Sequence, residues 1–133
     1  MQKCFVPMRE YVFTAGAGGT IYAFLEIFWR GYTHWSMIVA GALAAVLLYW
    51  IREHLGGLPL FWRCVLGAAG ITLVELAVGC VVNLWWNMGV WDYSDMPWNL
   101  WGQICPAFSA MWFFLCMPAF WLCGAIRERL REK

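Results

Sequence analysis

Charged side chains are scarce in this sequence. Only 13% of its 133 residues are Asp, Glu, Lys or Arg, and the formal net charge is +1. Soluble domains usually carry about a quarter charged and roughly half apolar residues, whereas 63% of this chain is apolar. The composition excludes an ordinary soluble domain and predicts an integral membrane protein surrounded by a lipid bilayer. The near-neutral charge also argues against nucleic acid as a partner.

Motifs of catalytic and metal chemistry are missing as well. The sequence has no phosphate-binding loop, no paired-histidine helix motif and no Ser/His/Asp spacing, so it is not expected to hydrolyse ATP itself. No C-x-x-C pair links any of its cysteines, which are expected to pack as small apolar side chains: Cys4, Cys64, Cys80, Cys105, Cys116 and Cys123. We therefore assign no catalytic residue, no metal and no cofactor, and an enzyme is the less favoured class.

Long apolar stretches are what the sequence has instead. Four of them approach the ~20 residues that a helix needs to cross hydrocarbon, namely residues 11–29, 35–51, 63–86 and 104–126. The first is as long as a full span, and its small residues lie inside it, so a retained helix is predicted rather than a secretory signal. The predicted fold class is an all-α membrane protein, a single four-helix transmembrane domain over residues 1–133.

Basic residues gather on one side of these spans. Every Lys and Arg except Arg30 precedes the first span, flanks the second connection or follows the last span. Because basic residues in short connections stay cytoplasmic, we expect a multi-pass protein of the bacterial cytoplasmic (inner) membrane with both termini in the cytoplasm. The first connection (residues 30–34) and the long third connection (residues 87–103, the outer connection) then face outside.

A faint internal repeat relates the two halves. Superposing Glu26 on Glu75 aligns a glycine-rich, Thr-containing apolar stretch before each, and a polar-aromatic connection plus one further span after each. This pattern predicts two two-helix repeats in parallel orientation.

Glu75 stands near the middle of the third span. A carboxyl at this depth is costly unless it faces protein or water, so it marks a functional site by default. Helical spacing places Thr72, Glu75, Gly79, Asn83 and Asn87 on one face. Glu75 could take up a proton or exchange it for a cationic ligand; the alternative is that it stays protonated and holds a neighbouring helix by hydrogen bonds.

The outer connection is rich in tryptophan and contains Asp92 and Asp95, but no Lys or Arg. Carboxylates and indole faces attract cations; the alternative is an ordinary interfacial belt of tryptophan. Ser94 or Asp95 followed by Pro97 also predicts the start of a short helix. We expect this segment to lie in the interface or to re-enter the membrane.

These features predict one outward-facing polar-aromatic pocket around Glu75, for a small or amphiphilic ligand that could be cationic. The candidate ligand-binding residues are Glu75, Glu26, Asn83, Asn87, Asp92, Trp86, Trp91, Asn99 and Gln103. For Glu26 the alternative is an ion pair with Arg30, one helical turn later. His34 is expected to be a surface or capping residue.

The sequence resembles a bacterial family of small polytopic membrane proteins, the ABC-transporter permeases termed ABC-transporter type IV. The resemblance spans nearly the whole chain. It rests on Glu26, Glu75, Pro97, Asn99, Leu100 and the stretches RGYTHWS (30–36), WDYS (91–94) and GQIC (102–105). It implies a membrane transport component, for which a separate ATPase subunit would be a partner.

We therefore expect a small transport-type or ligand-binding unit. Four spans rarely enclose a path alone, so a homodimer is the economical arrangement. Three other classes stay open: a dimer of the drug-exporter type, a non-transporting accessory or assembly protein, and an intramembrane enzyme acting on a lipid-linked substrate.

Overall fold

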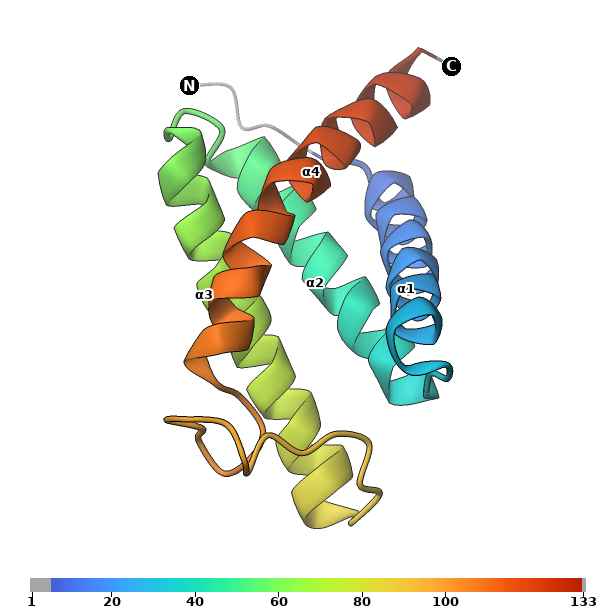
Figure 1. Ribbon diagram of the computed structural model, residues 1–133. Helices are drawn as coiled ribbons and strands as arrows, with labels where there is room; N and C mark the ends of the chain where they lie inside the picture. Colours follow the sequence, from blue (N-terminus) through green and yellow to red (C-terminus); the bar gives the residue numbers. More distant parts are fainter. Residues whose placement is uncertain (1–5, 133) are drawn as a thin grey trace.

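Four long helices make up the protein, whose computed structural model describes residues 6–132 (Figure 1). They are α1 (Met8–Arg30), α2 (Trp35–His54), α3 (Leu60–Gly79) and α4 (Pro106–Arg131), and a π-helical segment, η1 (Cys80–Trp85), continues α3. Each helix is long and apolar enough to cross a membrane, and the described residues form no β-strand. The predicted all-α, four-span fold is confirmed.

The helices extend further at one end of the bundle than the predicted spans. α1 begins at Met8 instead of residue 11, α2 continues to His54, and α4 continues to Arg131 instead of residue 126. Hydropathy falls where charged side chains begin, but a backbone helix continues as long as its hydrogen bonds do. The additional turns bring charged residues such as Glu10 and Arg131 into the bundle.

α2 is the central helix and packs against α1, α3 and α4. Glycine permits its close approach to α1. A Cβ on Gly18 would collide with the Cβ of Ala45, and a Cβ on Gly41 would lie 2.6 Å from the Cβ of Tyr22. Small residues serve this purpose in lipid, where helices associate through close packing.

The main core lies between α2, α3 and α4. Tyr49, Cys64, Cys116 and Phe120 are among its most buried members. The described cysteines are free thiols, and most of them are buried, in keeping with the packing role expected for them. Cys4 lies outside the described residues.

The two helical hairpins, α1–α2 and α3–α4, are equivalent in chain order, and each packs extensively within itself. α2 also contacts α3, and α4 lightly contacts α1. Two parallel two-helix repeats would give this arrangement, although their relation in sequence stays a prediction.

The outer connection folds back against the end of α3 and the beginning of α4 (Figure 1). It contains turns rather than the short helix predicted from Ser94, Asp95 and Pro97, so that prediction is wrong. The physical reason is the backbone: Trp98 and Trp101 have φ values of 59° and 56°, which a right-handed helix does not contain.

Candidate functional site

Glu75 lies buried on α3, with 6% of its surface exposed. Its Oε1 accepts a hydrogen bond of 2.9 Å from the hydroxyl of Tyr93, and its Oε2 accepts one of 3.1 Å from Nε1 of Trp112. Within residues 6–132, no Lys or Arg forms a salt bridge with this carboxyl. Neutral donors from the outer connection and from α4 therefore hold Glu75.

Both donors are fixed by aromatic packing. The ring of Tyr93 stacks on Phe108 with centroids 4.6 Å apart, and the ring of Trp112 packs against Tyr22 with centroids 5.9 Å apart. Burial and the nearby Glu75 carboxyl raise the pKa of Tyr93. Tyr93 therefore remains a neutral hydroxyl donor throughout the physiological pH range.

The carboxyl of Glu75 has acceptor capacity left over. An ionised carboxylate offers about four acceptor sites, and the two hydrogen bonds to Tyr93 and Trp112 occupy one on each oxygen. No cation within the described chain pairs with this carboxyl, so in its ionised form a further donor would find a site on either oxygen.

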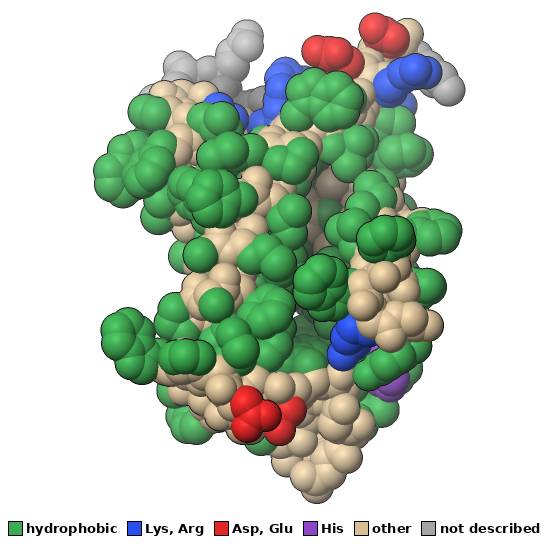
Figure 2. Space-filling view, viewed as in Figure 1, with side chains coloured by type: hydrophobic (Ala, Val, Ile, Leu, Met, Phe, Trp, Pro, Cys, Tyr) green, Lys and Arg blue, Asp and Glu red, His purple; other side chains and the backbone are tan. Residues whose placement is uncertain are grey.

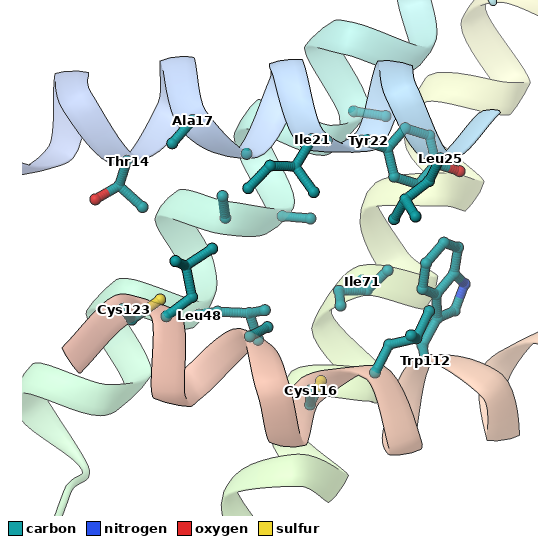
Figure 3. A pocket seen from close by; sticks show the side chains of 18 of the residues that line it. Thr14, Ala17, Ile21, Tyr22, Leu25, Leu48, Ile71, Trp112, Cys116 and Cys123 are labelled. Atoms are coloured by element: carbon teal, nitrogen blue, oxygen red, sulfur yellow. The ribbon is translucent and has the colours of Figure 1, made fainter. Parts of the chain in front are cut away.

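A cavity of about 260 Å³ lies beside Glu75, and all four helices line it (Figure 3). α1 and α4 form its walls: Thr14, Ala17 and Ile21 of α1 lie opposite Cys116 and Cys123 of α4. Nearly all lining side chains are apolar, and Glu75 is the only Asp, Glu, Lys or Arg among those identified. The hydroxyl of Thr14 already donates to the backbone oxygen of Glu10, at 2.7 Å. We call this space the α1–α4 groove.

Asn83, Trp91 and Gln103 bind the outer connection to the end of α3. Nδ2 of Asn83 donates to Oε1 of Gln103 at 2.8 Å, and Nε1 of Trp91 donates to the backbone oxygen of Gln103 at 3.0 Å. Gly79 makes room for them, since a Cβ there would lie 2.6 Å from Oε1 of Gln103. The structure brings these three predicted site residues together, near Glu75 but outside the lining of the groove.

Asp92 and Asn99 shape the outer connection itself. Oδ1 of Asp92 accepts hydrogen bonds from the hydroxyl and the backbone N–H of Ser94, which lower the pKa of Asp92. The side chain of Asn99 donates to the backbone oxygens of Ser94 and Met96 and accepts from the N–H of Gly102. Neither side chain lines the groove.

Trp86 and Asn87 lie away from Glu75. Both are exposed, and neither lines the groove. Asn87 was expected on the Glu75 face from regular α-helical spacing, but η1 widens the helix before it, and Asn87 itself has a φ of 52°. The helix therefore ends before Asn87 can share a face with Glu75.

Glu26 forms the ion pair with Arg30, with 2.6 Å between Oε2 and Nε. Nη1 of Arg30 donates to the backbone oxygen of Val90 at 2.9 Å, which fastens the end of α1 to the outer connection. Tyr22 interacts electrostatically with both Glu26 and Glu75. His34 caps α2, because its Nδ1 accepts from the N–H of Ser36.

Sequence reasoning missed part of this site. Tyr93 stood inside the conspicuous WDYS stretch, but Trp112 is one aromatic residue among many on α4, and no local signal distinguishes it. Tyr22 carried no signal either. Contacts between segments far apart in the chain, such as Trp112 to Glu75, become visible only when the helices are packed.

A second buried acid lies in the first turn of α1. Glu10 is completely buried; the hydroxyl of Tyr49 donates to its Oε2, and Nε of Arg131 donates to its Oε1 at 2.9 Å. Nearby, Glu53 pairs with Arg52, Arg127 and Arg131. We call this cluster the charged end. The described residues include no group of His, Cys, Asp and Glu that could hold a metal ion.

Comparison with known proteins places the chain in a family. No curated protein and no solved structure shows a significant match. A family model described as "Putative ABC-transporter type IV" matches residues 16–132, which is most of the chain. With four helices apolar enough to span a membrane, the protein fits a membrane transporter component. The chain belongs to the ABC-transporter type IV family.

Proposed function

We propose that this protein is the membrane-embedded ligand-binding unit of a transport system, and that Glu75 binds the polar group of the ligand. One observation carries the proposal: a buried carboxyl that pairs with no cation among residues 6–132 stands on the wall of an apolar cavity. Its oxygens retain acceptor sites. A ligand that brings a positively charged donor, above all a protonated amine, would complete the site.

The surroundings of Glu75 favour this role over a purely architectural one. Taking a carboxylate out of water without a counter-ion is expensive. A neutral side chain such as Gln would connect α3 with α4 or with the outer connection more cheaply. The retained carboxyl is better explained by a ligand that makes use of its charge.

The remaining partners are part of the same proposal. The chain has no ATP-binding motif, so an ABC-type mechanism would take its energy from a separate ATPase subunit. Four helices rarely enclose a path, so the working unit would be a homodimer in the bacterial inner membrane with cytoplasmic termini. In the proposed pocket, Asn83, Trp91 and Gln103 hold the outer connection in place while Glu75 makes the contact with the ligand.

Binding of a short hydrophobic amine tests the role of Glu75. The purified full chain in lipid nanodiscs is titrated with n-hexylamine, and the Glu75→Gln variant is compared with the Glu128→Gln variant. Glu128 is exposed near the end of α4 and does not line the groove. We expect Glu75→Gln to weaken binding by about tenfold or more, which corresponds to about 1.4 kcal/mol, and Glu128→Gln to leave it unchanged.

Equal binding by the wild type and Glu75→Gln would contradict the proposal. A non-transporting accessory or assembly role would then be favoured, particularly if the chain co-purifies with a larger membrane partner. Turnover of a lipid-linked substrate that depends on Glu75 would instead favour the intramembrane enzyme.

A further inference from the structure

The α1–α4 groove is long and narrow. Its α4 wall runs from Trp112 to Ile126, a length of about 21 Å at ~1.5 Å per residue. The hydrocarbon of one bilayer leaflet is about 15 Å thick, half of the ~30 Å core. The groove therefore has the length of a hydrocarbon chain rather than the shape of a compact solute.

Small residues are part of the lining of the groove. Gly18 of α1, Gly41 and Ala44 of α2 and Ala119 of α4 all belong to its lining. Its volume of about 260 Å³ exceeds the ~150 Å³ of an engineered apolar cavity that remains dry and binds benzene. An apolar guest of considerable size can therefore be accommodated.

Contacts between α1 and α4 lie at both ends of the groove. The rings of Tyr22 and Trp112 lie together at the Glu75 end. At the charged end, Arg131 pairs with Glu10, and Nη2 of Arg9 donates to the backbone oxygen of Leu130 at 3.1 Å. These contacts join α1 to α4 on either side of the groove.

The side of the groove is open. Ile21, Leu25 and Leu115 line it and are 41%, 52% and 38% exposed. Figure 2 shows the molecule hollowed on this face, among apolar side chains. In a membrane these side chains face lipid, so the bilayer itself is the route by which a ligand reaches Glu75.

The charge distribution restricts the head of the ligand. Glu75 lies at the Trp112 end of the groove and is the only Asp, Glu, Lys or Arg among its identified lining residues. Glu26 is balanced by its ion pair with Arg30, so it adds no net charge, and the outer connection adds Asp92 and no Lys or Arg. The carboxyl of Glu75 attracts a protonated amine and repels a phosphate, which favours a simple amine over the head of a phospholipid.

We propose that the α1–α4 groove binds a single-chain cationic amphiphile that enters sideways from the bilayer, with its amine at Glu75 and its alkyl chain along α4 towards Ile126. The position of the head rests on the proposed function; the chain site and the lateral entry go beyond it.

Filling the groove tests the chain site. The full chain in nanodiscs is titrated with n-dodecylamine and n-hexylamine, after subtraction of the uptake of each probe by empty discs. Ala119→Phe places a ring in the groove, and Ala110→Phe, at an exposed position of α4 outside the lining, is the matched control. We expect Ala119→Phe to weaken n-dodecylamine binding about tenfold or more, because the buried methylenes lose their place. Binding of n-hexylamine should change by less than about twofold, and Ala110→Phe should behave as the wild type.

The outcomes separate the two proposals. If Glu75→Gln weakens n-hexylamine binding but Ala119→Phe leaves n-dodecylamine binding unchanged, the chain site is wrong and the proposed function stands. If Ala119→Phe acts as expected but Glu75→Gln has no effect on either amine, the role of Glu75 as the ligand's anchor is wrong and the groove remains as a chain site.

Photo-crosslinking locates the chain directly. n-Dodecylamine with a diazirine at its terminal carbon is irradiated in the discs, and the labelled peptides are identified by mass spectrometry. Labelling of Leu122, Cys123 or Ile126 supports the proposal. Labelling confined to lipid-facing residues such as Phe24 and Phe28 overturns it, as does complete displacement of the probe by phosphatidylethanolamine.

Discussion

Two glutamates are buried in this bundle, Glu10 in the first turn of α1 and Glu75 near the middle of the third span, and their charges are treated differently. Glu10 meets Arg131 and Tyr49, so its charge is balanced inside the protein. Among the described residues, the hydrogen-bond donors to Glu75 are Tyr93 and Trp112, which carry no charge. The paired acid fastens α1, α2 and α4 together, whereas the unpaired acid faces a cavity and keeps the capacity to bind something else.

The difference shows that burial of an acid does not by itself indicate whether its role is structural or functional. Both acids are buried, and both connect separate elements, so neither property distinguishes structure from function. What distinguishes them is whether the protein supplies the counter-charge. Each of the following predictions tests that distinction, from the largest expected effect to the smallest.

Removing the cation of the paired site should have the largest effect. Breaking a buried ion pair by removing one partner costs about 3–5 kcal/mol; Arg131 is 33% exposed, so we expect Arg131→Ala to lower the free energy of unfolding by about 2 kcal/mol. Arg129→Ala, at an exposed position two residues away, is the control and should have little effect. Denaturation in detergent, followed by circular dichroism, measures both. Similar stabilities of the two variants would mean that Glu10 does not need its cation.

The same substitution at the two acids should give opposite outcomes. Glu10→Gln leaves Arg131 without its closest carboxylate, and we expect a loss of about 1.5 kcal/mol in the free energy of unfolding. Glu75→Gln leaves no cation behind. We expect it to lower the free energy of unfolding by about 0.5 kcal/mol, because the NH2 group of Gln would face one of the two donors that the carboxyl accepts from. Only Glu75→Gln should weaken amine binding. If Glu75→Gln is the more destabilising of the two, the assignment of structural and functional roles is reversed.

Removing a neutral donor from Glu75 should have a moderate effect. Tyr93→Phe deletes one of the two hydrogen bonds to the carboxyl, and we expect the free energy of unfolding to fall by about 1 kcal/mol, because hydrogen bonds to charged groups are worth more than neutral ones. Tyr32→Phe, at a position 60% exposed, removes a hydroxyl that makes no such contact. Thermal melting compares the pair, and an unchanged Tyr93→Phe would show that Trp112 alone holds Glu75.

Substituting Asp92, an exposed acid, should have the smallest effect. The effect should be present near neutral pH and absent in strong acid. Hydrogen bonds from Ser94 lower the pKa of Asp92 below its ordinary value of 3.8. The folded connection therefore gains stability above that value and loses it as the pH falls through the lowered pKa. Asp92→Asn should speed hydrogen exchange at the Ser94 amide near neutral pH, relative to the wild type, and the difference should vanish in strong acid. A difference independent of pH would exclude the charge of Asp92 as its cause.

The architecture could be predicted from the sequence because the bilayer places a simple requirement on every helix that crosses it. Every helix that crosses hydrocarbon must be long and apolar, so the four spans could be located by composition. The same rule identified Glu75, because a carboxyl inside an apolar span is an exception to it. The conspicuous WDYS stretch also pointed to a segment that does contact Glu75, through Tyr93.

The partners of the buried acids could not be predicted in the same way. Glu10 and Arg131 are 121 residues apart, and each resembles an ordinary charged residue at the edge of a span. Asn83 donates a hydrogen bond to Gln103, a contact between α3's continuation and the outer connection that the polarity of the two side chains alone does not predict. The groove depends on the angle at which α1 and α4 diverge, which helical periodicity does not specify.

The wide turn of η1 has a consequence for how this chain tolerates changes in length. An α-helix advances by about 100° per residue, and a π-type turn accommodates one residue more than the α-helical repeat would. Deleting a single residue within 80–85 would thus restore an ordinary helix, and the chain beyond it would keep nearly its present direction, because the π-type turn had already absorbed the additional residue. Deleting a residue from the regular helix between Glu75 and Gly79 would instead rotate the outer connection by about 100° about the helix axis and carry Tyr93 away from Glu75. This part of the chain should therefore tolerate the loss of one residue within η1 better than the loss of one just before it.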